Sequence, residues 1–217
     1  HLAAIVPIKV VNRNPLKANQ VNFNGTKNIV DACVEKKIKW FFFSSTSHVY
    51  KSSQKNISEN NLKKPISYYG LTKLRAENYI IKKFRDAKIS YCIGRIFSTT
   101  NKNQKKNYLV PDLKFKIKKS KKKLILKNLN HYRDFISMED ISKIIFILLK
   151  KNFNGILNLG SGKGIFLKDI AKLIAKKYKK KVDFSDNKKT TYLIASVTKL
   201  LKIYKLKIPK KIEKVIF

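Results

Sequence analysis

Glycine is scarce in this chain, with only 7 among 217 residues, and no glycine-rich loop lies near the N-terminus. Such a loop, placed between a strand and a helix, supplies the backbone N–H groups and the helix N-terminus that bind a dinucleotide pyrophosphate. The chain also begins at His1 rather than at a methionine. The sequence therefore offers no loop of this kind near its first residues.

Cysteine is equally rare. Cys33 and Cys92 lie in apolar helix and strand contexts, and neither has the spacing of a metal ligand. His131 also lacks Cys, His or carboxylate partners at such a spacing, so we expect no metal site. Two buried free thiols indicate a reducing compartment, and the cytoplasm is the expected location. The longest apolar runs are too short to span a bilayer, which predicts no membrane partner.

Acidic residues number 13 against 50 Lys and Arg, which gives a formal net charge of +37. A charge of this size and sign is typical of proteins that bind nucleic acid or other polyanions. Lysine is nevertheless spread along the whole chain, and only five residues are arginine, the side chain that nucleic-acid readers favour. A coding bias toward A/T-rich codons explains this composition. We expect no specific nucleic-acid partner, and a basic polyanion-binding protein stays open as an alternative.

An apolar, aromatic run at 39–44 stops abruptly at hydroxyl residues. A short run of this kind, bounded by turn-forming residues, is typical of a strand buried on both faces. A polar loop at 47–65 follows, and Ser67 is then a plausible N-cap for a helix at 67–87. Within that helix Tyr69 and Lys73 lie on one face, about one turn apart. Because ligands bind beyond the carboxyl ends of parallel strands, we expect a strand-end hydroxyl to meet this Tyr/Lys pair there.

These side chains suit hydride transfer to or from an alcohol or a ketone. A free tyrosine titrates near pH ~10 and is a poor base at neutral pH, but a nearby ammonium lowers its pKa. A Ser or Thr hydroxyl can orient the substrate oxygen. Taken alone, Y-x-x-x-K is common and more often represents a core tyrosine and a solvated lysine. The preceding S-S-T-S-H-V-Y, at the end of the predicted strand, favours the catalytic interpretation.

Both segments resemble motifs of the extended short-chain dehydrogenase/reductase superfamily, the branch of nucleotide-sugar epimerases, dehydratases and reductases. That branch carries S-S-x-x-V-Y at the end of its fifth strand and Y-G-x-S/T-K on the next helix, matched here at 44–50 and 69–73. The resemblance implies that Thr46 is the catalytic hydroxyl residue, Tyr69 the acid/base, and Lys73 the helper that also holds the nicotinamide ribose. It extends from His1 to about Leu206.

The first four residues, H-L-A-A, resemble the turn that ends the family's fourth strand. In relatives this turn lies against the cofactor, and the G-x-x-G-x-x-G loop, its helix and two further strands precede it. The resemblance therefore implies that this sequence is an N-terminally truncated piece of a longer protein. The missing segment of two or more βα units, at ~30 residues each, amounts to about 70 residues, and its absence leaves an exposed sheet edge. The resemblance implies NAD as cofactor, with NADP not excluded, and the residues expected to contact it are Leu2, Ala3, Ala4, Asn22, Ser44, Ser45, Tyr69, Lys73 and Phe97.

Three further positions depend on the same resemblance. Asn22 begins N-x-x-G-T, which approaches the nicotinamide end of the family's site; a polar cap or a helix–helix contact is the alternative. Ser98 ends a segment similar to R-x-F-N, where relatives often have Asn. Arg133 begins a segment similar to R-D-F-I/V-x-V-x-D, and it either contacts a phosphate or forms an ion pair with Asp134 or Asp140. The expected substrate-binding residues are Thr46, Ser98 and Arg133.

The expected fold is α/β, a partial Rossmann-type doubly wound parallel sheet with a small C-terminal α/β substrate lobe. We expect a truncated dinucleotide-binding core at 1–98 and the substrate lobe at 99–217, interleaved with a returning core strand and helix around 132–160. The periodicity predicts helices at 15–36, 67–87, 107–120, 138–151 and 166–178, and strands at 39–44, 89–97 and 124–126. Family members often dimerise through the two helices that correspond to 15–36 and 67–87, so the resemblance implies a homodimer.

The resemblance implies an NAD(P)-dependent enzyme that acts on a nucleotide-diphosphate sugar. The family's 4,6-dehydratases follow the catalytic Thr with Asp-Glu, whereas Ser47 and His48 follow Thr46 here, which disfavours dehydration. We favour an epimerase similar to the UDP-sugar 4-epimerases over a 4-keto-sugar reductase, although the sequence does not separate the two. An inactive truncated remnant is the alternative of another class.

Overall fold

The computed structural model describes residues 1–101 and 103–205. Its central sheet has the order β1-β2-β5 and consists of β1 (Trp40–Thr46), β2 (Ser90–Ile96) and β5 (Gly155–Leu159), all parallel. This confirms the α/β fold with a parallel sheet and the predicted strands at 39–44 and 89–97. β1 continues two residues beyond the prediction, because Ser45 and Thr46 still pair with β2. The hydroxyl residues therefore form the end of the strand itself.

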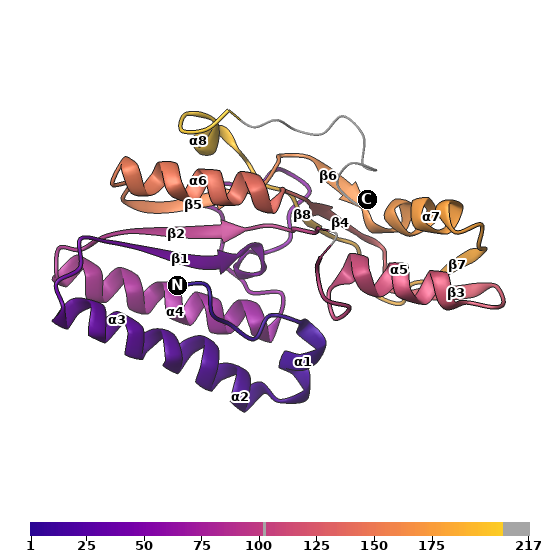
Figure 1. Ribbon diagram of the computed structural model, residues 1–217, viewed down its shortest axis with the longest axis horizontal. Coiled ribbons are helices and arrows are strands. Elements are labelled where there is room, and N and C mark those ends of the chain that lie inside the picture. The colour runs from indigo at the N-terminus through magenta and orange to yellow at the C-terminus, as the bar shows by residue number, and fades with distance from the viewer. Residues whose placement is uncertain (102, 206–217) are drawn as a thin grey trace.

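Helices cover both faces of this sheet (Figure 1). On one face lie α4 (Tyr68–Asp86) and a long helix made of α2 (Pro15–Asn19), a π-helical turn at Gln20–Asn24 and α3 (Gly25–Glu35). On the other face lies α6 (Met138–Lys150). The predicted helices at 15–36, 67–87 and 138–151 are confirmed. A further helix, α1 (Ile8–Arg13), was not predicted, and only Val11 of its residues is buried.

Alternation along β1 supplies both hydrophobic layers. Phe41 and Phe43 pack with Val30, Ile80 and other buried residues of α3 and α4. Phe42 points the opposite way and packs against the apolar face of α6. Since successive side chains of a strand point to opposite faces, an uninterrupted aromatic run serves two cores at once.

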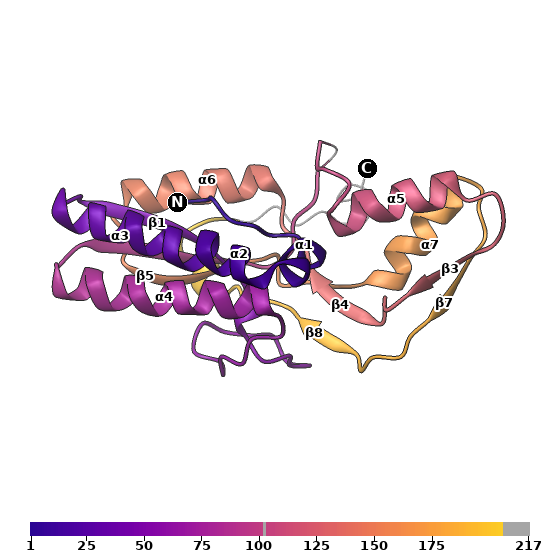
Figure 2. The same ribbon diagram turned by 90° about the horizontal axis from the view of Figure 1, so that it is seen from below.

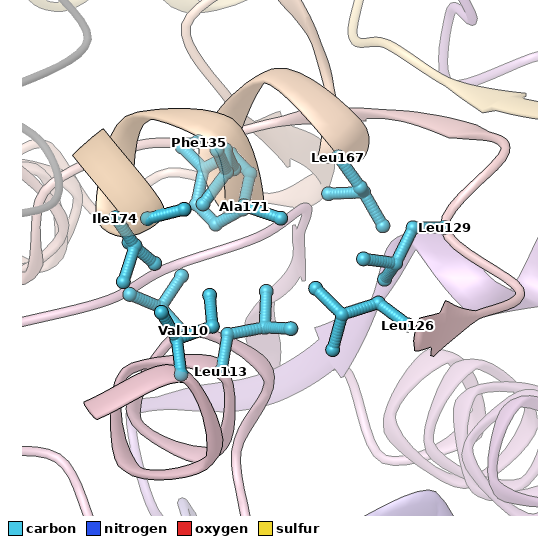
Figure 3. Packing of buried hydrophobic residues seen from close by; sticks show 11 residues of the cluster. Val110, Leu113, Leu126, Leu129, Phe135, Leu167, Ala171 and Ile174 are labelled. Atoms are coloured by element: carbon cyan, nitrogen blue, oxygen red, sulfur yellow. The ribbon is translucent and has the colours of Figure 1, made fainter. Parts of the chain in front are cut away.

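A second group of elements extends from one end of this sheet (Figures 1 and 2). It contains α5 (Leu109–Lys119), α7 (Leu167–Lys177), the parallel pair β3 (Leu124–Lys127) and β7 (Val182–Ser185), and a small sheet of order β6-β4-β8. The strands of that small sheet are β4 (His131–Asp134), β6 (Gly164–Phe166) and β8 (Thr191–Leu193). Figure 3 shows the side chains of α5 and α7 meeting in one apolar cluster. We call this group the α5–α7 region; its helices were predicted, whereas β4, β6, β7 and β8 were not.

The first residues of the chain lie beside β1. His1 accepts a hydrogen bond from the Ser44 backbone N–H at 3.1 Å, and its amino group donates to the Phe42 carbonyl at 2.7 Å, so it lies along the open edge of β1. Residues 1–4 are not a strand, and among the described residues no other strand pairs with this edge.

The last helix of the described residues is α8 (Thr198–Leu201). Leu206 and the other residues at 206–217, with 102, lie outside the described residues. Cys33, expected to be buried, is half-buried.

Candidate active site

The carboxyl end of β1 and the start of α4 are brought together by a short connection. Thr46 ends the strand, and its Oγ1 accepts a hydrogen bond from the His48 backbone N–H at 3.3 Å, which begins the 3₁₀ turn η2 (Ser47–Val49). Ser67 is the N-cap of α4, as predicted, since its Oγ accepts from the Gly70 N–H at 3.1 Å. Tyr69 therefore lies in the first turn of a helix that begins beside the end of the strand.

Gly70 allows this close approach. A Cβ added at Gly70 would lie 2.3 Å from the His48 carbonyl oxygen, a distance that real Cβ atoms essentially never show. Any side chain there would push α4 away from η2. The absence of a side chain instead leaves the Tyr69 ring in edge contact with the His48 ring, their centroids 6.1 Å apart. The close packing of α4 on η2 therefore requires a glycine at this position of the Y-G-x-x-K segment.

Tyr69 and Thr46 form the centre of the candidate site, and both are buried. Burial raises the pKa of the Tyr69 phenol above its ordinary value, and Tyr108 at the start of α5 adds to the rise. A side-chain hydrogen bond from Thr46 opposes it. The two residues predicted to be catalytic therefore lie close enough for this bond, which opposes the rise in the Tyr69 pKa. The predicted effect of Lys73 on Tyr69 stays a prediction.

Lys73 lies one turn further along α4, with only 1% of its surface exposed. Its Nζ lies 4.1 Å from the centroid of the Phe43 ring on β1. Burial lowers the pKa of Lys73 to about 7, although the nearby Glu77 carboxylate opposes the change. An ammonium in this position changes its charge near neutral pH, which no exposed lysine does.

Asn22 is fully buried on the π-helical turn and holds two segments together. Its Oδ1 accepts from the Ile5 N–H at 2.7 Å, and its Nδ2 donates to the Ile5 carbonyl at 3.0 Å and to Thr72 Oγ1 at 3.2 Å. This is the helix–helix contact that the sequence left as an alternative, with an added link to the N-terminal segment. A direct contact of Asn22 with a cofactor stays a prediction.

The other residues expected to contact the cofactor differ in how deeply they are buried. Leu2 and Ala3 are exposed, Ala4 and Ser44 are half-buried, and Phe97 is buried at the end of β2. Ser45 is also buried, and its hydroxyl donates to Glu77 rather than pointing toward the end of the strand. The roles of these residues toward a cofactor stay predictions.

Ser98 and Arg133 lie where the central sheet meets the α5–α7 region. The Ser98 N–H donates to the Asp134 carbonyl at 2.7 Å and its carbonyl accepts from the Ile136 N–H at 2.9 Å, so its backbone joins the ends of β2 and β4. Arg133 donates to Thr191 Oγ1 at 2.9 Å and to two backbone carbonyls. Burial lowers the pKa of Arg133 to about 10.

Neither ion pair proposed for Arg133 is present. Asp134 accepts from the backbone N–H groups of Ser161, Gly162 and Ala195, and Asp140 accepts from Ser137 and Tyr204. Both carboxylates are therefore held by other donors, and the two ion-pair alternatives are wrong. A contact between Arg133 and a phosphate stays a prediction.

Sequence reasoning missed a buried charged pair behind Lys73. Arg95 and Glu77 are each 1% exposed or less, and Arg95 Nη2 lies 2.6 Å from Glu77 Oε2. The available signal was Glu77 itself, four residues after Lys73 and therefore on the same helix face, where a carboxylate must be buried with it. A charged residue on a buried face requires a partner.

His48 was also missed as a neighbour of Tyr69. Its Nδ1 lies 3.0 Å from Ser67 Oγ, and burial lowers the pKa of its imidazole to about 4, with Arg133 adding to the effect. The ring is therefore neutral at neutral pH. Among the residues described, no group of three or more His, Cys, Asp or Glu side chains could hold a metal ion. In the same part of the chain, no helix is long and apolar enough to cross a membrane.

Two curated proteins are similar to this chain in sequence. A GDP-6-deoxy-D-talose 4-dehydrogenase of Aggregatibacter actinomycetemcomitans is 32% identical over 178 residues, which are 80% of this chain and 59% of the relative. An ADP-L-glycero-D-manno-heptose-6-epimerase of Brachyspira hyodysenteriae is 29% identical over 167 residues, 73% of this chain and 52% of the relative. The chain thus spans between half and three fifths of the length of these curated relatives.

A solved UDP-N-acetylglucosamine 4-epimerase from Methanobrevibacter ruminantium M1 is similar in structure, with a TM-score of 0.87 and 24% sequence identity. The match covers 100% of this chain and 73% of the epimerase chain. At that identity the likeness shows the fold alone. Residues 1–160, well over half of the chain, match the model of the NAD dependent epimerase/dehydratase family. The chain belongs to the NAD dependent epimerase/dehydratase family.

Proposed function

We propose that the protein transfers hydride at a carbinol carbon of a nucleotide-diphosphate sugar, as an epimerase similar to the UDP-sugar 4-epimerases. The observation that carries the proposal is the buried pair of Thr46 and Tyr69 at the end of β1, with Lys73 one turn further along α4. Family membership supports the reaction class.

The residues present fit one half of an NAD site. Lys73 is buried with its ammonium over an aromatic ring, which leaves it able to bind the hydroxyl groups of a nicotinamide ribose beside Tyr69. The N-terminal segment, tied down by Asn22, and Phe97 at the end of β2 would complete this side. The 217 residues contain no glycine-rich loop for the pyrophosphate. When bound, NAD would supply the acceptor for the hydride.

The side chains divide the remaining work. Thr46 would donate a hydrogen bond to the sugar oxygen and hold it beside the Tyr69 hydroxyl. Tyr69 would take the proton of that oxygen on oxidation and return it on reduction. Because burial holds the Tyr69 phenol protonated in the structure described here, a positive charge nearby is needed before it can act as a base. Lys73 in its ammonium form would provide that charge.

A dehydrogenase or 4-keto-sugar reductase is the second candidate. The 32% identical relative is a 4-dehydrogenase of a GDP-linked sugar and supports this candidate, whereas the 29% identical relative is an epimerase. Both use the same proton transfer at Tyr69. They differ in whether the reduced cofactor leaves after each turnover.

The test is to incubate the full-length protein with UDP-glucose and NAD and to follow both the sugar product and the nicotinamide absorbance. Formation of the 4-epimer without a net absorbance change supports the epimerase, and a rise in proportion to product supports the dehydrogenase. Tyr69→Phe removes the proton-carrying oxygen and should lower turnover by about 10²–10⁴-fold. Tyr68→Phe, at the neighbouring half-buried tyrosine, is the matched control.

Full turnover by Tyr69→Phe would show that the assignment of the acid/base is wrong.

We also propose that the protein dimerises through α4 and the long helix made of α2, the π-helical turn and α3. These helices lie on one face of the sheet (Figure 2). Sedimentation of the full-length protein tests this separately from the activity.

A further inference from the structure

The carboxylate of Glu77 is held from three directions in the interior. Ser45 Oγ donates to Oε1. Arg95 Nε donates to the two carboxylate oxygens at 3.0 and 3.2 Å, and Arg95 Nη2 donates to Oε2 at 2.6 Å. All three residues are at least 98% buried. The carboxylate is therefore fixed relative to β1 and β2, the two strands that carry Thr46 and Phe97 at their ends.

Arg95 is itself held by a second layer of partners. Its Nη1 donates to the Tyr50 hydroxyl at 2.8 Å and to the Glu59 carbonyl at 3.0 Å. Tyr50 in turn donates to Asn158 Oδ1 on β5 at 2.7 Å. The network thus joins all three strands of the central sheet to α4, and its side chains are buried together. A guanidinium with this many fixed acceptors keeps its position and its charge, and the pKa of Arg95 is raised because the bonds to Glu77 and Tyr50 exceed the effect of burial.

Two other charged side chains lie near this network: Glu59, which accepts from the Asn158 N–H at 2.9 Å, and Lys73 on α4. Glu77 follows it by one helical turn on α4, the Phe43 ring of β1 lies beneath its Nζ, and Tyr69 precedes it by one turn. The amino group of His1, beside β1, also acts on it by repulsion. Of these groups only Glu77 favours a charged Lys73.

We propose that Glu77, fixed by Arg95 and Ser45, is a positioning residue that favours the ammonium form of Lys73 beside Tyr69. This rests on the proposed function, in which Lys73 must be charged for Tyr69 to act as a base. Arg95 restrains the effect, because a carboxylate that it binds is less available to Lys73. Glu77 and Arg95 together therefore leave both the ammonium and the neutral amine form of Lys73 accessible.

A purely structural pair makes a different prediction. If Glu77 and Arg95 only joined α4 to the sheet, losing either partner would disturb Lys73 in the same way. If Glu77 sets the charge of Lys73, the two losses have opposite effects. Glu77→Gln removes the favourable negative charge, whereas Arg95→Met frees the carboxylate to act on Lys73 alone.

The experiment is an NMR titration of the chain labelled with [¹³C]lysine, which follows the Cε signals between pH 5 and 10. Lys73 is distinguishable because its pKa is about 7 while ordinary lysines titrate near 10.5, and its signal is assigned with Lys73→Arg. We expect Glu77→Gln to lower the midpoint and Arg95→Met to raise it, each by about one unit. Glu139→Gln, at an exposed carboxylate on α6, is the matched control and should change nothing.

Midpoints that move in the same direction, or that do not move, would overturn the proposal. If Glu77→Gln does not fold, the double variant Glu77→Gln with Arg95→Met carries the test, since loss of the carboxylate must bring its midpoint below that of Arg95→Met alone. The titration needs neither NAD nor a sugar. It can therefore succeed when the turnover assay fails, and a failure of the proposed function stays distinguishable from a failure of this inference.

Discussion

The surroundings of α4 and the apolar cluster between α5 and α7 differ in the kind of side chain that they bury. Around α4 the interior contains a lysine, a glutamate and an arginine, together with the buried hydroxyls of Ser45 and Thr46. The cluster between α5 and α7 is formed by aliphatic side chains and Phe135, and none of the buried polar residues in the described chain lies on either helix (Figure 3). Both regions are equally well buried, so the difference lies in chemistry and not in packing.

This contrast shows where the fold contains buried charged groups that reduce its stability. Buried charges destabilise a protein unless each is paired and hydrogen-bonded, and apolar residues of similar volume often serve stability as well or better. The cluster between α5 and α7 contains only such apolar side chains among its buried residues. The polar interior around α4 is understandable if its charges serve the chemistry at Tyr69, since stability alone does not require them.

The largest effect should come from breaking the buried pair. Glu77→Ala leaves the Arg95 guanidinium buried without its carboxylate, which should lower the free energy of unfolding by about 3–5 kcal/mol. The double variant Glu77→Leu with Arg95→Met removes both charges and should recover most of that loss. Urea denaturation of the three proteins measures both values. Equal losses in the single and double variants would mean that the pairing of the charges is not what the single variant disrupts.

A truncation in the apolar cluster should cost slightly less and leave the site alone. Leu113 on α5 is 4% exposed and packs against α7, so Leu113→Ala should lower the free energy of unfolding by about 3 kcal/mol. Its distance from α4 predicts an unchanged titration of Lys73. If the midpoint of Lys73 shifts in this variant, the two regions are coupled and the contrast drawn between them does not hold.

Periodicity predicted the long helices and the central strands because those elements bury one face or both faces over many residues. The helix at 67–87 and the strand at 89–97 follow from such patterns, and both are confirmed. β6 and β8 have three residues each, too few for any alternation to appear. Their pairing with β4 depends on contacts between distant segments, which a local pattern does not contain.

The site was predicted in part for a related reason. Thr46, Tyr69 and Lys73 lie in two short segments with recognisable spacing, so the sequence could bring them together. The pairing of Glu77 with Arg95 joins a helix to a strand 18 residues later and has no local signature. The orientation of Lys73 over Phe43 likewise depends on the depth at which α4 packs on β1. The bound state of the cofactor and the acid/base roles remain predictions.

The smallest of these effects concerns His48, which lies at the boundary between the two regions. Its pKa of about 4 in the folded protein is below the ordinary 6.5, so the unfolded chain binds a proton more readily at intermediate pH. The stabilisation from the neutral ring is present above pH 6.5 and is lost as the pH falls toward 4. Because water reaches part of the ring, we expect about 2 kcal/mol.

The measurement is the free energy of unfolding of the wild type and His48→Gln at several pH values between 4 and 7. Gln keeps a hydrogen-bonding group near Ser67 but does not titrate, so the two curves should converge as the pH falls. His131→Gln is the matched control: its ring is less buried and lies on β4, and its pKa is lowered mainly by burial. Parallel curves for His48→Gln and the wild type would mean that the imidazole beside Tyr69 is accessible to protons in the folded protein, and the site would then be more open to water than its packing indicates.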